Sequence, residues 1–162
     1  MRVSAAYRDS AAQRAPAERC APGGARVIVA DVNLLAYLLF GAPETEIAQR
    51  VLERDPIWAA PVLWRSEFRS ILAAIMRRRG LPATEARRAH ELAESLLGGN
   101  EYTLNGERVL QLVAESPCSA YDCEYVALAQ ELRVPLVTSD REILRHFPQT
   151  AASPKEFVRD SA

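Results

Sequence analysis

Two short apolar runs, each closed by an aspartate, constrain the fold of this chain most strongly. Residues 26–30 (RVIVA) lead directly into Asp31, and residues 134–139 (VPLVTS) lead directly into Asp140. Short β-branched runs are typical of buried strands, and helical patterns fill the chain between them. Alternating strands and helices indicate an α/β domain with a parallel sheet and helices on both faces. If the strands are neighbours, the two carboxylates meet at one edge, because parallel strands end on the same side.

Apolar spacing and glycine stops predict the other elements. We expect helices over 34–40, 44–54, 61–79, 84–97, 107–115, 119–133 and 140–146, and strands over 26–30, 56–60, 101–104, 134–139 and 149–152. Thr84 is the expected N-cap of its helix. Residues 1–25 are rich in alanine, arginine and small polar residues, and we expect a disordered or loosely attached extension there. The domain itself is predicted to span 26–158, followed by a short tail over 159–162.

Composition excludes several classes of function. The formal net charge is −1, so no overall positive field attracts a polyanion. Lys155 is the only lysine, which argues against Schiff-base chemistry, and no phosphate-binding loop of the G-x-x-x-x-G-K-[ST] type occurs. Three cysteines and two histidines argue against a zinc site, and the cysteines are expected to be reduced and packed as small apolar residues. No apolar run reaches the roughly 18 residues that span a membrane.

Two further acids fall on the predicted helices beside apolar positions. Glu67 has Trp64 three residues before it and Ile71 four residues after it, and Asp122 is followed at helical spacing by Tyr125. A buried carboxylate needs a compensating partner. One such acid can be paired with an arginine, whereas four that converge suggest a divalent cation.

The chemistry of such a site is specific. Oxygen-only ligands suit Mg²⁺ or Mn²⁺, and a bound cation lowers the pKa of water and neutralises phosphate. The expected reaction is metal-assisted phosphodiester hydrolysis. Each acid also has a simpler interpretation. Asp31, Asp122 and Asp140 can act as helix caps, and Glu67 can pair with an arginine.

Three segments carry a resemblance to a known family. The series VIVADVNLL, WRSEFRSIL and SAYDCEYVALAQELRVPLVTSDREI resembles the PIN domain, and within it the VapC toxin ribonucleases of bacterial toxin–antitoxin pairs. The resemblance covers residues 26–158. It implies an acidic quartet of Asp31, Glu67, Asp122 and Asp140. It also implies that Asn33 positions Asp31 or the substrate, and that Thr138 hydrogen-bonds a carboxylate or the attacking water.

The resemblance carries further expectations. It implies a three-layer α/β/α sandwich with about five parallel strands, a homodimer and Mg²⁺ or Mn²⁺ as cofactor. The implied substrate is structured RNA, often tRNA or rRNA, and the implied partner is a VapB-type antitoxin. A cytoplasmic bacterial location without membrane attachment follows from the same family.

Other polar and aromatic residues are open to two interpretations. An arginine-rich face suits phosphate but is more often simply solvated; the arginines concerned are Arg65, Arg69, Arg77, Arg78, Arg79, Arg87 and Arg88. We expect Glu124 to be solvated, His90 to be a surface residue and His146 to be a helix-end residue. We expect Tyr37, Trp58 and Trp64 to be core or interface residues rather than base-stacking platforms.

Two other functions remain open from the sequence. A phosphatase of the haloacid-dehalogenase or receiver type also has an aspartate after its first strand, but here the second position is Asn33 and no suitable lysine follows a later strand. A degenerate PIN-like module that binds RNA or a partner without cleavage is the third possibility, and the complete quartet argues against it.

Overall fold

The computed structural model describes residues 27–41 and 43–159, and the predictions for residues 1–25 and for the end of the tail lie outside this range. Within it, five parallel strands form one central sheet in the order β3-β2-β1-β4-β5. The strands are β1 (Val27–Ala30), β2 (Ile57–Pro61), β3 (Glu101–Tyr102), β4 (Leu136–Val137) and β5 (Ala151–Ala152).

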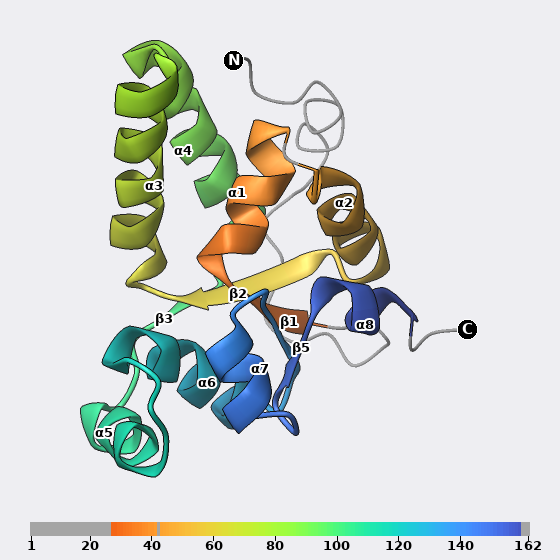
Figure 1. Cartoon of the computed structure of the whole chain (residues 1–162), viewed down its shortest axis with the longest axis vertical. Helices are drawn as coiled ribbons and strands as arrows, with labels where there is room; N and C mark the ends of the chain where they lie inside the picture. Colours follow the sequence, from red (N-terminus) through yellow and green to blue (C-terminus); the bar gives the residue numbers. More distant parts are fainter. Residues whose placement is uncertain (1–26, 42, 160–162) are drawn as a thin grey trace.

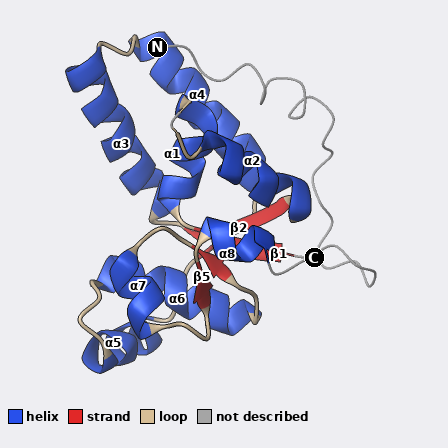
Figure 2. Cartoon of the chain, turned by 45° about the vertical axis from the view of Figure 1, so that its right-hand side comes forward, coloured by secondary structure: helices blue, strands red, loops and turns tan. Residues whose placement is uncertain are grey.

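Helices cover both faces of this sheet. Helices α1 (Val32–Phe40), α2 (Thr45–Arg54), α3 (Trp64–Arg79) and α4 (Ala83–Leu97) lie on one side in Figure 1. Helices α5 (Gly106–Glu115), α6 (Ala120–Leu132) and α7 (Arg141–His146) lie on the other, and α8 (Pro154–Arg159) packs against α2. Figure 2 shows the same arrangement with the sheet between two groups of helices. The predicted three-layer α/β/α sandwich with a parallel sheet of about five strands is confirmed.

The core is built from the apolar sides of these elements. Ile28 and Val29 of β1 are fully buried, as is Trp58 of β2. Trp64 and Phe68 of α3 are also fully buried, which agrees with the expected apolar side of this helix. A strand buried on both faces requires a continuous apolar run, and this explains why β1 shows no polar alternation.

Several predicted boundaries need correction. Pro61 ends β2 instead of opening the next helix, because α3 begins only at Trp64. Thr84 lies inside α4, whose N-cap is Pro82 without a side-chain cap. Helix α8 was not predicted, although Ser153, Pro154 and Glu156 form a helix-start pattern with proline at the first position.

The glycine stops are confirmed. Gly41, Gly80 and Gly98 end α1, α3 and α4 with φ near +60°, a conformation that favours glycine because it has no Cβ. No helix in the described part of the chain is long and apolar enough to cross a membrane.

Candidate functional site: acids at the carboxyl edge of the sheet

Asp31 lies where β1 ends and α1 begins. It is the N-cap of α1, and its Oδ1 accepts a hydrogen bond from the backbone N–H of Asn33 at 3.3 Å. Its side chain is almost entirely buried, with 6% of the residue exposed. Burial raises the pKa of this carboxyl, and hydrogen bonds from Thr138 and Asn33 only partly oppose that effect. The residue is therefore both a helix cap and a desolvated acid.

Thr138 connects Asp31 to Asp140. Its hydroxyl donates to Asp31 Oδ2 at 2.5 Å and accepts from the backbone N–H of Asp140 at 3.0 Å. The contact exists because β1 and β4 are neighbouring strands, and the backbone N–H of Asp31 donates to Val137. Of the two roles expected for Thr138, the structure gives it the hydrogen bond to a carboxylate.

Asp140 is the N-cap of α7. Its Oδ1 accepts from the backbone N–H groups of Glu142 and Ile143, at 2.8 and 3.0 Å. The cap occupies one oxygen, and Oδ2 has no hydrogen bond to any described residue. Repulsion from Asp140 adds to the raised pKa of Asp31, so the two carboxylates are close enough to interact.

Glu67 lies in the first turn of α3, and its partner is a tyrosine. The Tyr125 hydroxyl of α6 donates to Glu67 Oε2 at 2.6 Å. Burial first, and then the negative charge of Glu67, raise the pKa of Tyr125, so the phenol remains a donor. The arginine partner considered from the sequence is absent among the described residues.

Asp122 lies in the first turn of α6 and takes part in a capping box. Its Oδ2 accepts from the backbone N–H of Ser119 at 2.9 Å and from the Ser119 hydroxyl at 2.7 Å. The Ser119 hydroxyl in turn accepts from the backbone N–H of Asp122. The capping interpretation is therefore correct for Asp31, Asp122 and Asp140 alike.

Electrostatic interactions connect these acids across the fold. Burial raises the pKa of Glu67, and repulsion from Asp31, Asp122 and Glu124 raises it further. Glu124 was expected to be solvated, but it is half-buried, and burial raises its pKa too. Its proximity to Glu67 follows because α6 meets the start of α3 at this edge, through the hydrogen bond from Tyr125 to Glu67, and helical spacing alone does not reveal this contact. The carboxyl edge thus contains five acids, and each is close enough to at least one of the others to interact electrostatically. They are Asp31, Glu67, Asp122, Glu124 and Asp140.

The acids supply the oxygen donors that a divalent cation requires, but they are not gathered into a ready-made binding site. Their ligands are all oxygens, which suit Mg²⁺ or Mn²⁺, and a cation relieves the desolvation and repulsion seen at Asp31 and Glu67. No three His, Cys, Asp or Glu side chains in the described ranges are gathered as a ready-made metal site. The donor chemistry fits a cation, while the side chains stand apart.

The arginines of the middle helices divide into two groups. Arg65 is partly buried and makes a bidentate contact with Glu101 at 2.8 and 2.9 Å, with Glu94 on its other side. Arg77, Arg78, Arg87 and Arg88 are exposed. Arg65 is thus committed to holding β3, α3 and α4 together.

His90 was expected at the surface, and this was wrong. Its ring stacks on Trp64 at 5.7 Å and lies 6.3 Å from Phe68, and its side chain is only 19% exposed. Because Trp64 is fully buried, a ring stacked on it is enclosed between α3 and α4. His146 lies in the last turn of α7, as predicted, near Glu142. Trp58 and Trp64 are core residues and Tyr37 is half-buried.

The fold agrees with that of a known family. The PIN domain model matches residues 28–148, which is most of the chain. The chain belongs to the PIN domain family. PIN domains are generally nucleases and typically use divalent metal ions.

Solved structures share the fold at low sequence identity. A toxin–antitoxin complex from Klebsiella pneumoniae is 20% identical with a TM-score of 0.58, covering 80% of this chain and 97% of that chain. A crystal structure from Pyrobaculum aerophilum is 22% identical with a TM-score of 0.62, covering 83% of this chain and 89% of that chain. The search of curated proteins returned no match.

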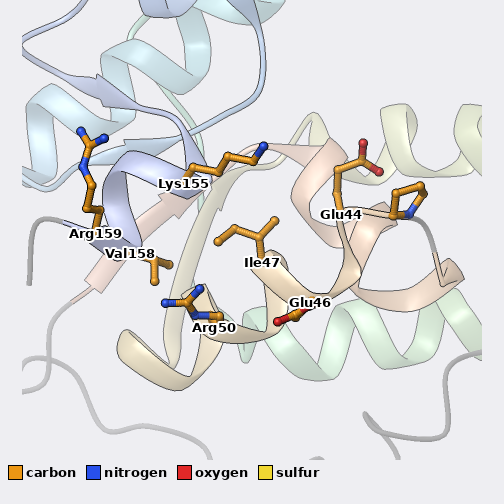
Figure 3. Close-up of a pocket in the computed structure, with 8 residues that line it drawn as sticks. Glu44, Glu46, Ile47, Arg50, Lys155, Val158 and Arg159 are labelled. Atoms are coloured by element: carbon orange, nitrogen blue, oxygen red, sulfur yellow. The ribbon is translucent and has the colours of Figure 1, made fainter.

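A separate groove of about 750 Å³ lies between α2 and α8 of this PIN domain (Figure 3). Its lining includes Ile47 and Val158, with Arg50, Lys155 and Glu44 around them. None of the edge acids lines it. The mixed charge gives the groove no clear preference for phosphate, so the carboxyl edge is the better candidate site.

Proposed function

We propose that this PIN domain is a metal-dependent endoribonuclease that acts as the toxin of a toxin–antitoxin pair. The proposal rests most on one observation: Asp31, Glu67, Asp122 and Asp140 follow strands or open helices at the same edge of a parallel sheet. The family match supports nuclease chemistry, and the similarity to a toxin–antitoxin complex from Klebsiella pneumoniae supports an antitoxin partner. A VapB-type antitoxin, a homodimer and a cytoplasmic bacterial location complete the proposal.

Each residue has a proposed role. Asp31, Glu67, Asp122 and Asp140 would hold Mg²⁺ or Mn²⁺, which supplies an activated water and neutralises charge on the phosphate. Thr138 fixes the rotamer of Asp31 and ties it to the start of α7. Asn33 supports the ionised form of Asp31 by hydrogen bonding. Tyr125 holds Glu67 by donating a hydrogen bond to Oε2. The RNA substrate, for which tRNA and rRNA are candidates, binds across this edge.

The test is cleavage of RNA by the purified chain with EDTA, Mg²⁺ or Mn²⁺. We expect cleavage only with the cation, and a loss of about 100-fold or more in Asp31→Asn, because a cation site that loses its most buried carboxylate binds and positions the metal poorly. Glu53→Gln is the matched control, since Glu53 is exposed on α2.

Other outcomes separate the alternatives. Cleavage that persists in EDTA, or full activity of Asp31→Asn, contradicts the proposal. RNA binding without cleavage under every cation favours the degenerate binding module. A covalent aspartyl-phosphate formed from a small phosphoester favours the phosphatase. The partner is tested by co-expressing the toxin with the product of the adjacent reading frame and scoring rescue of growth.

A further inference from the structure

Three exposed apolar side chains stand at the ends of elements that meet at the carboxyl edge of the sheet. In the described part of the chain the exposed large apolar residues are Val62, Tyr102, Leu110 and Tyr121, and all but Leu110 border the carboxyl edge. Tyr121, 65% exposed, directly precedes Asp122 in the first turn of α6. Tyr102, 38% exposed, ends β3. Tyrosine is of intermediate burial in folded domains, so Tyr121, which is mostly exposed, needs a reason, and Tyr102 presents part of its ring at the same edge.

The direction of Tyr102 follows from its strand. Successive side chains of a strand point to opposite faces. Glu101 reaches Trp64 and Arg65 of α3, on the face covered by α1 to α4. Tyr102 therefore faces the layer that contains α6. Its backbone carbonyl accepts from the N–H of Val62, two residues before α3 begins.

Tyr121 lies on the same side of α6 as Tyr125, the hydrogen-bond partner of Glu67. It stands one helical turn before Tyr125, and residues four apart lie on the same side of a helix. Tyr125 donates to Glu67, so this side of α6 faces the start of α3. Figure 1 shows β3, the start of α3 and α6 at the same end of the sheet. The two exposed tyrosines therefore stand at the same edge of the sheet as Glu67, one on β3 and the other on α6.

We propose that Tyr102 and Tyr121 stack on unpaired RNA bases beside the scissile phosphate. This rests on the proposed nuclease function. A carboxylate-rich edge on a chain of net charge −1 repels a polyanion, so local cations alone bind it weakly and contacts that do not depend on charge add affinity. Base stacking on aromatic rings is such a contact, and a duplex cannot offer its bases to it. Exposed Arg69 and Arg141, near Glu67 and Asp140 in sequence, supply local cations for the flanking phosphates.

The experiment measures binding separately from cleavage. In the Asp31→Asn background, the dissociation constant for a short fluorescent RNA is measured by anisotropy, with the strand unpaired and with its complement annealed. We expect Tyr102→Ala and Tyr121→Ala each to raise the dissociation constant for unpaired RNA about tenfold. The dissociation constant for the duplex should remain unchanged. Tyr102→Phe and Tyr121→Phe retain the ring and are expected to bind like the parent, which also reports on folding.

Leu110→Ala is the matched control, because Leu110 is 66% exposed on α5 and lies outside the tyrosine pair. Alanine variants that bind unpaired RNA like the parent overturn the stacking role, even if the wild-type chain cleaves RNA. Equal losses of affinity for unpaired and duplex RNA also overturn the stacking role. Alanine variants that lose dimer or antitoxin binding but retain RNA binding assign the pair to a protein interface instead. Failure of the wild type to cleave RNA under any cation contradicts the nuclease function itself.

Discussion

Glu67 carries a charge that the fold does not neutralise. The Tyr125 hydroxyl is its described hydrogen-bond partner, while Asp31, Asp122 and Glu124 repel it and burial disfavours its ionised form. A carboxyl whose pKa is raised in the folded chain binds its proton more tightly there than when unfolded. The charge therefore lowers the stability of the folded state at pH values above the folded pKa. This loss of stability disappears as the pH falls towards the unfolded pKa of about 4.3. Such a penalty is typical of a residue retained for a task other than stability.

The variant Glu67→Gln tests this directly. Glutamine still accepts the hydrogen bond from Tyr125 but has no charge, so the metal-free variant should unfold at a higher temperature than wild type near pH 7. The gain should shrink on acidification and vanish below the unfolded pKa of glutamate. Thermal unfolding in EDTA across this pH range is the measurement. A variant less stable than wild type near pH 7 contradicts the account of Glu67.

At the scale of elements, helix starts double as anchors for the acids. Asp31 and Asp140 cap α1 and α7, while Asp122 closes the capping box of α6 with Ser119. The helix N-terminus, with its partial positive charge, holds each carboxylate at the sheet edge. Helix α8 starts with the same device, formed by Ser153 and Glu156. The chain therefore contains a matched pair of capping boxes, one inside the proposed site and one outside it.

Ser119→Ala and Ser153→Ala separate capping from site geometry. Each should lower the free energy of unfolding by about 1 kcal/mol, because each loses an N-cap hydroxyl. Only Ser119→Ala frees Asp122 from a contact that orients it, and we expect its Mn²⁺ affinity to fall about tenfold. Chemical denaturation and metal titration give the two quantities. Equal Mn²⁺ affinity in both variants would show that Asp122 takes no part in holding the cation.

At the scale of the whole molecule, the parallel sheet brings the acids together. The order β3-β2-β1-β4-β5 makes β1 and β4 neighbours, so Asp31 and Asp140 meet although 109 positions separate them. Helices α3 and α6 lie on opposite faces but meet at this edge through Glu67 and Tyr125. Acids from both helical layers and from the ends of strands thus lie at one edge of the sheet, which is the edge of the proposed site.

A cation that binds this edge should stabilise the entire chain. With Mg²⁺ or Mn²⁺ at about 100 times its dissociation constant, the gain is about 2.7 kcal/mol. Because the pKa values of Asp31 and Glu67 are raised, protons compete with the cation at a higher pH than for ordinary carboxylates. The cation-induced rise in Tm should therefore decline on acidification before exposed acids titrate. Glu115 is exposed on α5, so Glu115→Gln should show the same cation-induced rise in Tm as wild type. A cation-induced rise in Tm that does not change with pH contradicts the prediction.

The order of elements and the local role of the acids were accessible from the sequence. Helix stops at Gly41, Gly80 and Gly98, and caps at Asp31 and Asp140, depend on neighbours within a few residues, where backbone conformation and hydrogen-bonding rules apply directly. Boundaries at Pro61 and Thr84 were wrong, because sheet pairing extended β2 and the chain entered α4 through Pro82 without a side-chain cap.

The sequence by itself determined that two aspartates follow strands of a parallel sheet, Asp31 directly after β1 and Asp140 three residues after β4, since apolar runs and helical periodicity are local signals. Tertiary structure decided which groups those acids meet. The Thr138 hydroxyl reaches Asp31 and the Tyr125 hydroxyl reaches Glu67 only because strand order and helix packing place them there. The same packing enclosed His90 on Trp64 and drew Glu124 towards Glu67. Contacts between residues distant in the chain depend on the global free-energy minimum, and no short window of sequence contains that information.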